Sequence, residues 1–164
     1  MPKNKKSNFG YLLVVTLLLV VLPVWSIIME SCLRPGRSGL WDLTGKWFVF
    51  WAVGIRLLMA GFRQTFQPAF TAQEIFRIKD KASFAIVKEL GFANLCTGLA
   101  GVLTLWLPAW LVPTAFIGGL YYGLAGIGHL TKKADSPNEM IALYSDLFIF
   151  LVVMAFVVHS FFNR

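Results

Sequence analysis

The sequence predicts an all-α protein, a polytopic transmembrane helical bundle. Hydrophobic residues make up 57% of the 164-residue chain and charged residues only 14%, whereas soluble domains carry about a quarter charged residues. The mean hydropathy is +0.69. The apolar residues fall into five long runs, each near the ~20 residues that a helix needs to cross a bilayer. We therefore expect five spans, a four-helix core plus an N-terminal anchor helix.

The five spans are expected at about residues 11–29, 43–62, 84–107, 114–130 and 141–161. Residues 106–113 predict a tight turn at an interface, because prolines end helices and tryptophans favour the level of the lipid head groups. We divide the chain into an N-terminal anchor helix with an outer loop, residues 1–42, and a four-helix membrane bundle, residues 43–164. An inner interfacial loop is expected at residues 63–83.

The first run has a rival interpretation as a secretory signal peptide, because Lys3, Lys5 and Lys6 precede it. Its apolar stretch exceeds the ~7–15 residues usual for such peptides. Met29-Glu30-Ser31 is also a poor cleavage site, and the acidic residue argues against a lipoprotein signal before Cys32. We expect a retained anchor.

The basic residues predict that the N-terminus lies in the cytoplasm, since cytoplasmic connections carry an excess of Lys and Arg. In this orientation four basic residues are outside (Arg34, Arg37, Lys46, Arg164) and ten inside (Lys3, Lys5, Lys6, Arg63, Arg77, Lys79, Lys81, Lys88, Lys132, Lys133). Topology and anionic lipids thus explain the net charge of +7. No nucleic-acid partner is expected.

The loop at residues 63–83 mixes apolar side chains with the charged run Arg77-Ile78-Lys79-Asp80-Lys81. This composition suits a short helix that lies in the inner interface, with its basic side toward anionic head groups. An ordinary polar loop is the alternative.

Four ionisable residues fall inside the last four spans, all in the inner half of the bilayer: Arg56, Glu89, His129 and Asp146. A charge at a span centre costs about 2.5–3.5 kcal/mol on the insertion scale, which favours pairing over exposure to lipid. We expect Arg56 to pair with Glu89 or Asp146, and His129 with the remaining carboxylate. Intramembrane ionisable residues usually mark a functional site.

Helical spacing adds two residues to this candidate site. On the third span, Asn94 shares a face with Gly98 and Gly101, beside a second face that carries Glu89, Ala93, Cys96 and Ala100. On the fourth span, Tyr122 aligns with His129, next to the GxxxG spacing of Gly119 and Gly123. Small residues let helix backbones approach, so we expect these polar groups to point into the bundle.

The same residues also have structural interpretations. Arg56 and Glu89 would then form an ion pair without further function, and His129 would cap the C-terminus of its helix. One inner histidine with two carboxylates is too few ligands for zinc, and we expect no metal. The chain has no Ser-His-Asp order, CxxC, phosphate loop or HExxH, so no catalytic residue is assigned.

The string Glu89-Leu90-Gly91-Phe92-Ala93-Asn94-Leu95 is followed by Gly98 and Gly101, by Gly126-Ile127-Gly128-His129, by Asn138 and by Asp146. From about Trp47 onward the chain resembles a group of small bacterial membrane proteins classed as a domain of unknown function, similar in layout to DoxX-like proteins. The resemblance implies a compact helical bundle in the bacterial inner (cell) membrane, with Glu89, Asn94, His129 and Asp146 in its signature. The basic region at residues 76–88 departs from that pattern.

Two functions remain open. In the first, Arg56, Glu89, Asn94, Tyr122, His129 and Asp146 form an inner-leaflet site that binds a small amphipathic or quinone-like ligand or relays protons. The resemblance to DoxX-like proteins, associated with quinone-linked sulfur oxidation, implies a redox accessory role by analogy only. In the second, the chain is a structural or accessory subunit without a ligand site. No cofactor is identified beyond a quinone or lipid, and the expected partners are membrane lipids, another membrane protein or a second copy of this chain.

Overall fold

The computed structural model describes residues 9–75, 78–131 and 137–163. Within these ranges every regular element is helical, and five helices are long and apolar enough to cross a membrane, which confirms the predicted fold class. They are Phe9–Leu33, Leu40–Phe66, Ser83–Leu103, Pro108–Thr131 and Pro137–Phe162. Seven basic residues counted for the predicted orientation lie outside the described ranges: Lys3, Lys5, Lys6, Arg77, Lys132, Lys133 and Arg164.

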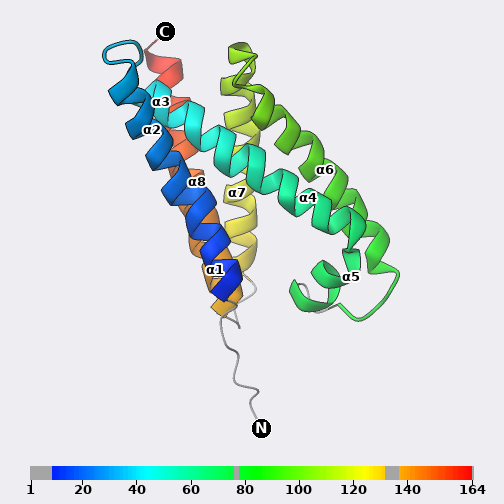
Figure 1. Ribbon diagram of the computed structural model, residues 1–164. Coiled ribbons are helices and arrows are strands. Elements are labelled where there is room, and N and C mark those ends of the chain that lie inside the picture. Colours follow the sequence, from blue (N-terminus) through cyan, green and yellow to red (C-terminus); the bar gives the residue numbers. More distant parts are fainter. Residues whose placement is uncertain (1–8, 76–77, 132–136, 164) are drawn as a thin grey trace.

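The helices alternate in direction, so the two termini lie at opposite ends of the bundle (Figure 1). The first span consists of α1 (Phe9–Thr16), η1 (Leu17–Val21) and α2 (Leu22–Leu33), and the second of α3 (Leu40–Phe48), η2 (Val49–Ile55) and α4 (Arg56–Phe66). The others are α6 (Ser83–Leu103), α7 (Leu111–Thr131) and α8 (Pro137–Phe162). The segments η1 and η2 are π-helical, with i→i+5 geometry in place of the α-helical i→i+4.

The observed helices extend a few residues past most of the predicted ends. The second runs from Leu40 to Phe66, and α7 begins at Leu111 with Pro113 in its first turn. Proline is tolerated there because its nitrogen would have no helical partner. The predicted turn at residues 106–113 contains the short 3₁₀ helix η4 (Pro108–Trp110), next to the exposed Trp106.

Part of the loop at residues 63–83 is helical. It contains α5 (Pro68–Phe70) and η3 (Thr71–Ile75), which follow α4 directly. The Arg63 guanidinium lies 3.5 Å from the centre of the Phe70 ring, and Ala72 is buried. A short helical segment therefore folds back against the end of α4.

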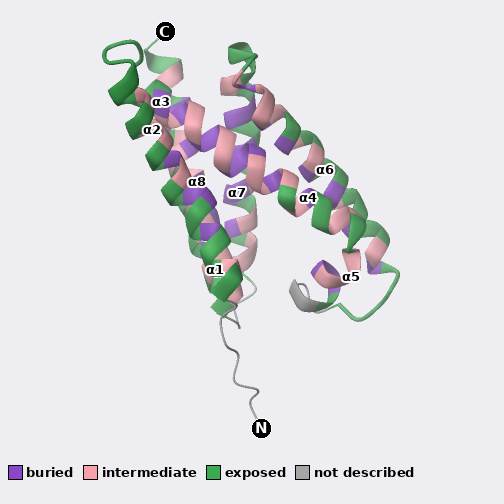
Figure 2. Ribbon diagram, viewed as in Figure 1, coloured by how far each residue is buried: buried purple, intermediate pink, exposed green. Residues whose placement is uncertain are grey.

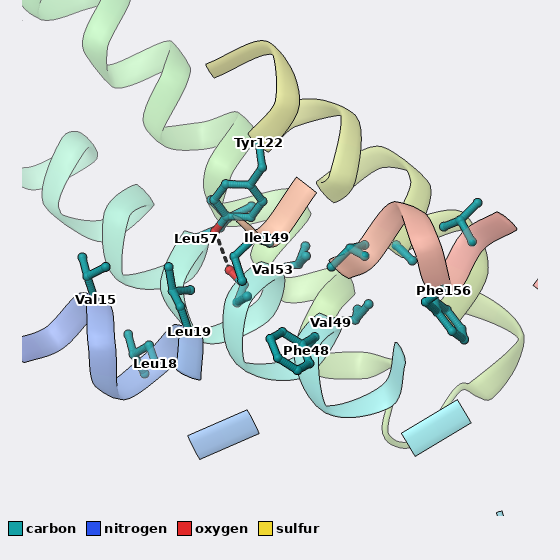
Figure 3. Packing of buried hydrophobic residues seen from close by; sticks show 14 residues of the cluster. Val15, Leu18, Leu19, Phe48, Val49, Val53, Leu57, Tyr122, Ile149 and Phe156 are labelled. Atoms are coloured by element: carbon teal, nitrogen blue, oxygen red, sulfur yellow. Dashed lines mark hydrogen bonds between the residues drawn. The ribbon is translucent and has the colours of Figure 1, made fainter. Parts of the chain in front are cut away.

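The hydrophobic core surrounds η2, as Figure 3 shows. The first span contributes Val15, Leu18 and Leu19 to it, so the N-terminal helix is part of the core and not only an anchor. The remaining buried members come from α3, η2, α4, α7 and α8: Phe48, Val49, Ala52, Val53, Leu57, Ala115, Tyr122, Ile149, Val153, Phe156 and Val157.

Helix α6 packs almost entirely against α4 and η2 and diverges from α7 below their connection (Figure 1). Its glycines are required for this contact. A Cβ atom on Gly98 would lie 2.6 Å from the backbone nitrogen of Leu58, and one on Gly101 would lie 2.6 Å from that of Gly54. The helix thus has one face against α4 and one face that no described residue of this chain covers.

The outer surfaces of the helices are exposed while the contacts between helices are buried (Figure 2). The exposed side chains include large apolar ones on every span, among them Trp25, Met59, Phe92, Ile117 and Leu151. Such a surface matches a lipid environment and not water. The chain is a multi-pass membrane protein.

Candidate functional site

An ion pair joins the second and fifth spans inside the bundle. Arg56 Nη1 lies 3.0 Å from Asp146 Oδ1, and the two side chains are only 16% and 8% exposed. Arg56 is ten residues from Phe66 and Asp146 nine from Pro137. At about 1.5 Å per residue, Arg56 and Asp146 therefore lie ~14–15 Å from those two helix ends, which are on the same side of the bundle as the N-terminus of the chain. Two charges at this depth must compensate each other.

The π-helical segment η2 immediately precedes Arg56 and sets the direction of its side chain. An i→i+5 turn takes one residue more than an α-helical turn, which rotates everything after it by about 100°. The hydroxyl of Tyr122 donates a 2.5 Å hydrogen bond to the carbonyl oxygen of Ala52 within η2, drawn as a dashed line in Figure 3. Helix α7 is thereby fixed against the segment that orients Arg56.

Two phenols surround the guanidinium. Arg56 Cζ lies 5.1 Å from the centre of the buried Tyr122 ring, within the range of a cation–π contact. Tyr11, near the start of α1, interacts with both Arg56 and Asp146. The ion pair is therefore enclosed by α1, α4, α7 and α8.

His129 lies on the other side of the carboxylate. Its Nε2 is 4.0 Å from Asp146 Oδ2, and its side chain is 26% exposed. Helices α7 and α8 are antiparallel, and helical side chains lean toward the N-terminus of their own helix. His129, two residues from the end of α7, therefore leans into the bundle while Asp146 leans toward that end. We call Arg56, Asp146, His129, Tyr11 and Tyr122 the Arg56–Asp146 cluster.

Asn94 forms a separate polar contact beside this cluster. It is 2% exposed, and its Nδ2 donates a 2.7 Å hydrogen bond to Gln64 Oε1 near the end of α4. Tyr121 on α7 interacts with Asn94 and, more weakly, with Asp146 and Arg56. Asn94 thus links α6 to α4 and α7, and its partners in the described chain lie outside the ion pair.

The structure does not bring Glu89 into the cluster, because Glu89 is exposed on α6. The buried face of that helix holds Val87, Gly91, Asn94, Gly98 and Gly101. At about 100° per residue, Glu89 and Cys96 lie ~160–180° from the middle of this face. The structure therefore buries the face of Asn94 and leaves that of Glu89 and Cys96 open.

Three polar residues near the cluster were not predicted from the sequence. Tyr11 was counted as the start of the first span and Gln64 as part of the loop, and no role was assigned to Tyr121. The signal for Gln64 is its position on α4 two turns after Arg56, on the same helical stripe as Arg56. Tyr144 on α8 is 64% exposed and lies outside the cluster.

A second polar cluster ties the first span to the second at the opposite end of the bundle. Lys46 Nζ lies 2.7 Å from both Glu30 carboxylate oxygens, and Trp47 Nε1 donates to Glu30 Oε2 at 2.8 Å. Trp51 Nε1 donates to Ser26 Oγ at 3.0 Å. Glu30 therefore has a structural role in docking α2 on α3.

The described residues hold no group of three or more His, Cys, Asp or Glu side chains placed to bind a metal ion. Both cysteines, Cys32 and Cys96, are free thiols on the surface. The Arg56–Asp146 cluster offers groups that exchange protons and form hydrogen bonds: a carboxylate, an imidazole, a guanidinium and phenols.

The fold and this cluster define a five-span helical membrane protein with a buried, tyrosine-enclosed ion pair. The chain belongs to the family of unknown function DUF6790, whose model matches residues 8–162. No curated protein and no solved structure matches the chain. The likeness to DoxX-like proteins stays a prediction.

Proposed function

We propose that the Arg56–Asp146 cluster binds the polar head group of a small amphipathic molecule, of which a quinone is the clearest case, and exchanges protons with it. The protein would do this in a bacterial inner membrane with its N-terminus in the cytoplasm. The observation that carries the proposal is the number of polar side chains gathered around the ion pair. A structural ion pair needs two residues, whereas here an imidazole and two phenols adjoin the pair.

The roles follow from position. Arg56 and the Tyr11 hydroxyl supply hydrogen-bond donors at the depth where a lipid-soluble ring resides, whereas the Tyr122 hydroxyl already donates to Ala52. Asp146 contacts Arg56 through one oxygen and faces His129 with the other. His129 is half-buried near the end of α7, with its Nε2 4.0 Å from Asp146 Oδ2. Protons would pass between that end of the bundle and the head group through His129 and Asp146.

The test uses the purified full-length protein in detergent and decylubiquinone as the probe. We expect the quinone to raise the thermal unfolding temperature of the parent protein, because a ligand that binds only the folded state stabilises it. Arg56→Lys keeps the charge opposite Asp146 but loses the planar fork, so it should fold and lose the quinone-induced shift. Glu89→Gln is the matched control and should keep the shift.

The proton step has its own measurement. The quinone-induced shift should be smaller in His129→Gln than in the parent, because this variant removes the imidazole that lies 4.0 Å from Asp146 Oδ2. If decylubiquinone does not change the unfolding temperature of the parent, or if Arg56→Lys responds as the parent does, the proposal is wrong.

One observation favours the second candidate function, a structural or accessory subunit. The Arg56 charge is already compensated by Asp146, and the pair connects α4 to α8 through the core. Under this function, Arg56→Lys and His129→Gln would change only the unfolding temperature, with no effect of any added quinone.

A further inference from the structure

We propose that the exposed face of α6 is a docking surface for a second copy of this chain, with Glu89 of one copy paired to Lys88 of the other. This goes beyond the proposed function, because the α6 face lies outside the Arg56–Asp146 cluster. Glu89 places a charge on the lipid-facing side of this helix.

Glu89 lies six residues after Ser83, or about 9 Å into the helix. It is exposed, and the described part of the chain shows no hydrogen bond or ion pair to its carboxylate. On a helix only residues three or four positions apart face each other. Those positions hold Ala85, Ile86, Phe92 and Ala93, all apolar. The charge therefore has no partner on its own helix.

The rest of this face is also open. Ala85, Phe92, Ala93 and Cys96 are exposed, while the opposite face is filled by α4 and η2. In Figure 2 the ribbon of α6 carries exposed residues in green along its length. A carboxylate on an apolar helix face inside the membrane calls for a cation, and no residue in the described ranges supplies one.

Charge complementarity selects a second copy as the occupant. Lys88, exposed and adjacent to Glu89, lies at the edge of the same face. Two copies in one membrane share the same orientation, so a twofold axis between their α6 helices places each Glu89 near the other copy's Lys88. A twofold contact repeats any favourable pair. This gives two ion pairs from one surface.

A native cysteine on this face allows the contact between two copies to be tested by crosslinking. Cys96 is exposed on the same face, two turns beyond Glu89, and the chain has only one other cysteine, Cys32. In a parallel α6–α6 pair the two Cys96 thiols face each other. The Cys32→Ser variant should therefore form a disulfide-linked dimer in native membranes when treated with copper–phenanthroline.

Two controls separate a specific contact from chance collisions. Cys96→Ser, which keeps Cys32, should give little dimer. Ile117→Cys in a chain without other cysteines places a thiol at similar depth on the exposed side of α7, and it should crosslink no more than collisions allow. Equal crosslinking at Cys96 and at position 117 would overturn the proposal.

The ion pair is tested by charge exchange in the Cys32→Ser background. Lys88→Glu should lower the crosslinked fraction about threefold. The combination of Lys88→Glu with Glu89→Lys should restore it, because the two pairs re-form with reversed signs. A double variant that stays as low as the single one would refute the pairing. So would single-molecule photobleaching that counts one copy per spot.

Discussion

Replacement of Asp146 by leucine tests the energetics of the buried pair most directly. It leaves the Arg56 guanidinium without its counter-charge among apolar helices. At 3.0 Å and an effective dielectric constant of about 20, the lost Coulomb attraction is ~5.5 kcal/mol. Breaking a buried pair from one side typically costs about 3–5 kcal/mol. We expect Asp146→Leu to lose an amount in this range.

The double variant gives the decisive comparison. Replacing both charges by apolar residues, Arg56→Met with Asp146→Leu, removes the attraction together with the cost of burying either charge. We expect it to lose less stability than Asp146→Leu alone, with a coupling energy of at least ~3 kcal/mol in the double-mutant cycle.

The assay is reversible unfolding of the purified protein in mixed detergent and dodecyl sulfate micelles, followed by circular dichroism. Tyr144→Phe, at an exposed position on α8, serves as a control and should change the free energy of unfolding by less than about 0.5 kcal/mol. If the losses of the two single variants simply add in the double variant, the charges do not interact and the reasoning on the cluster fails.

Three further predictions use the same measurement. Gly98→Ala should destabilise by about 1–3 kcal/mol, because its Cβ would meet the α4 backbone at 2.6 Å, whereas Gly128→Ala, with nothing within 4 Å, should be neutral. Asn94→Leu should cost about 1–3 kcal/mol, because it leaves the partly buried Gln64 amide oxygen without its 2.7 Å donor. Glu30→Gln should cost about 0.5–1 kcal/mol and matter less at high salt, since its ammonium partner on α3 is one-third exposed.

Most exposed apolar side chains on the five spans need no protein partner, because lipid covers them. The α6 face differs by one carboxylate that lipid cannot satisfy. Charge inside the membrane, and not exposed apolar area, is therefore the feature that separates a docking surface from an ordinary lipid contact in this chain.

The sequence by itself determined the number of spans, because a run of about 20 apolar residues has no other stable environment. It also indicated that the intramembrane charges would be paired, because an isolated charge in hydrocarbon is costly. This holds for Arg56 and Asp146, whereas Glu89 has no partner among the described residues. Helical geometry alone could have indicated that Arg56 pairs with Asp146 and not with Glu89. Glu89 lies on the side of α6 opposite the glycines that this helix needs against α4.

Only the tertiary structure decided the direction of the Arg56 side chain and the inclusion of Tyr11 in the Arg56–Asp146 cluster. The π-helical segment η2 shifts the register just before Arg56, and such a segment leaves no mark in α-helical periodicity. Tyr11 reaches the guanidinium because the first span packs into the core through Leu18 and Leu19. Both depend on contacts between residues distant in the chain, which the pattern along one helix does not encode.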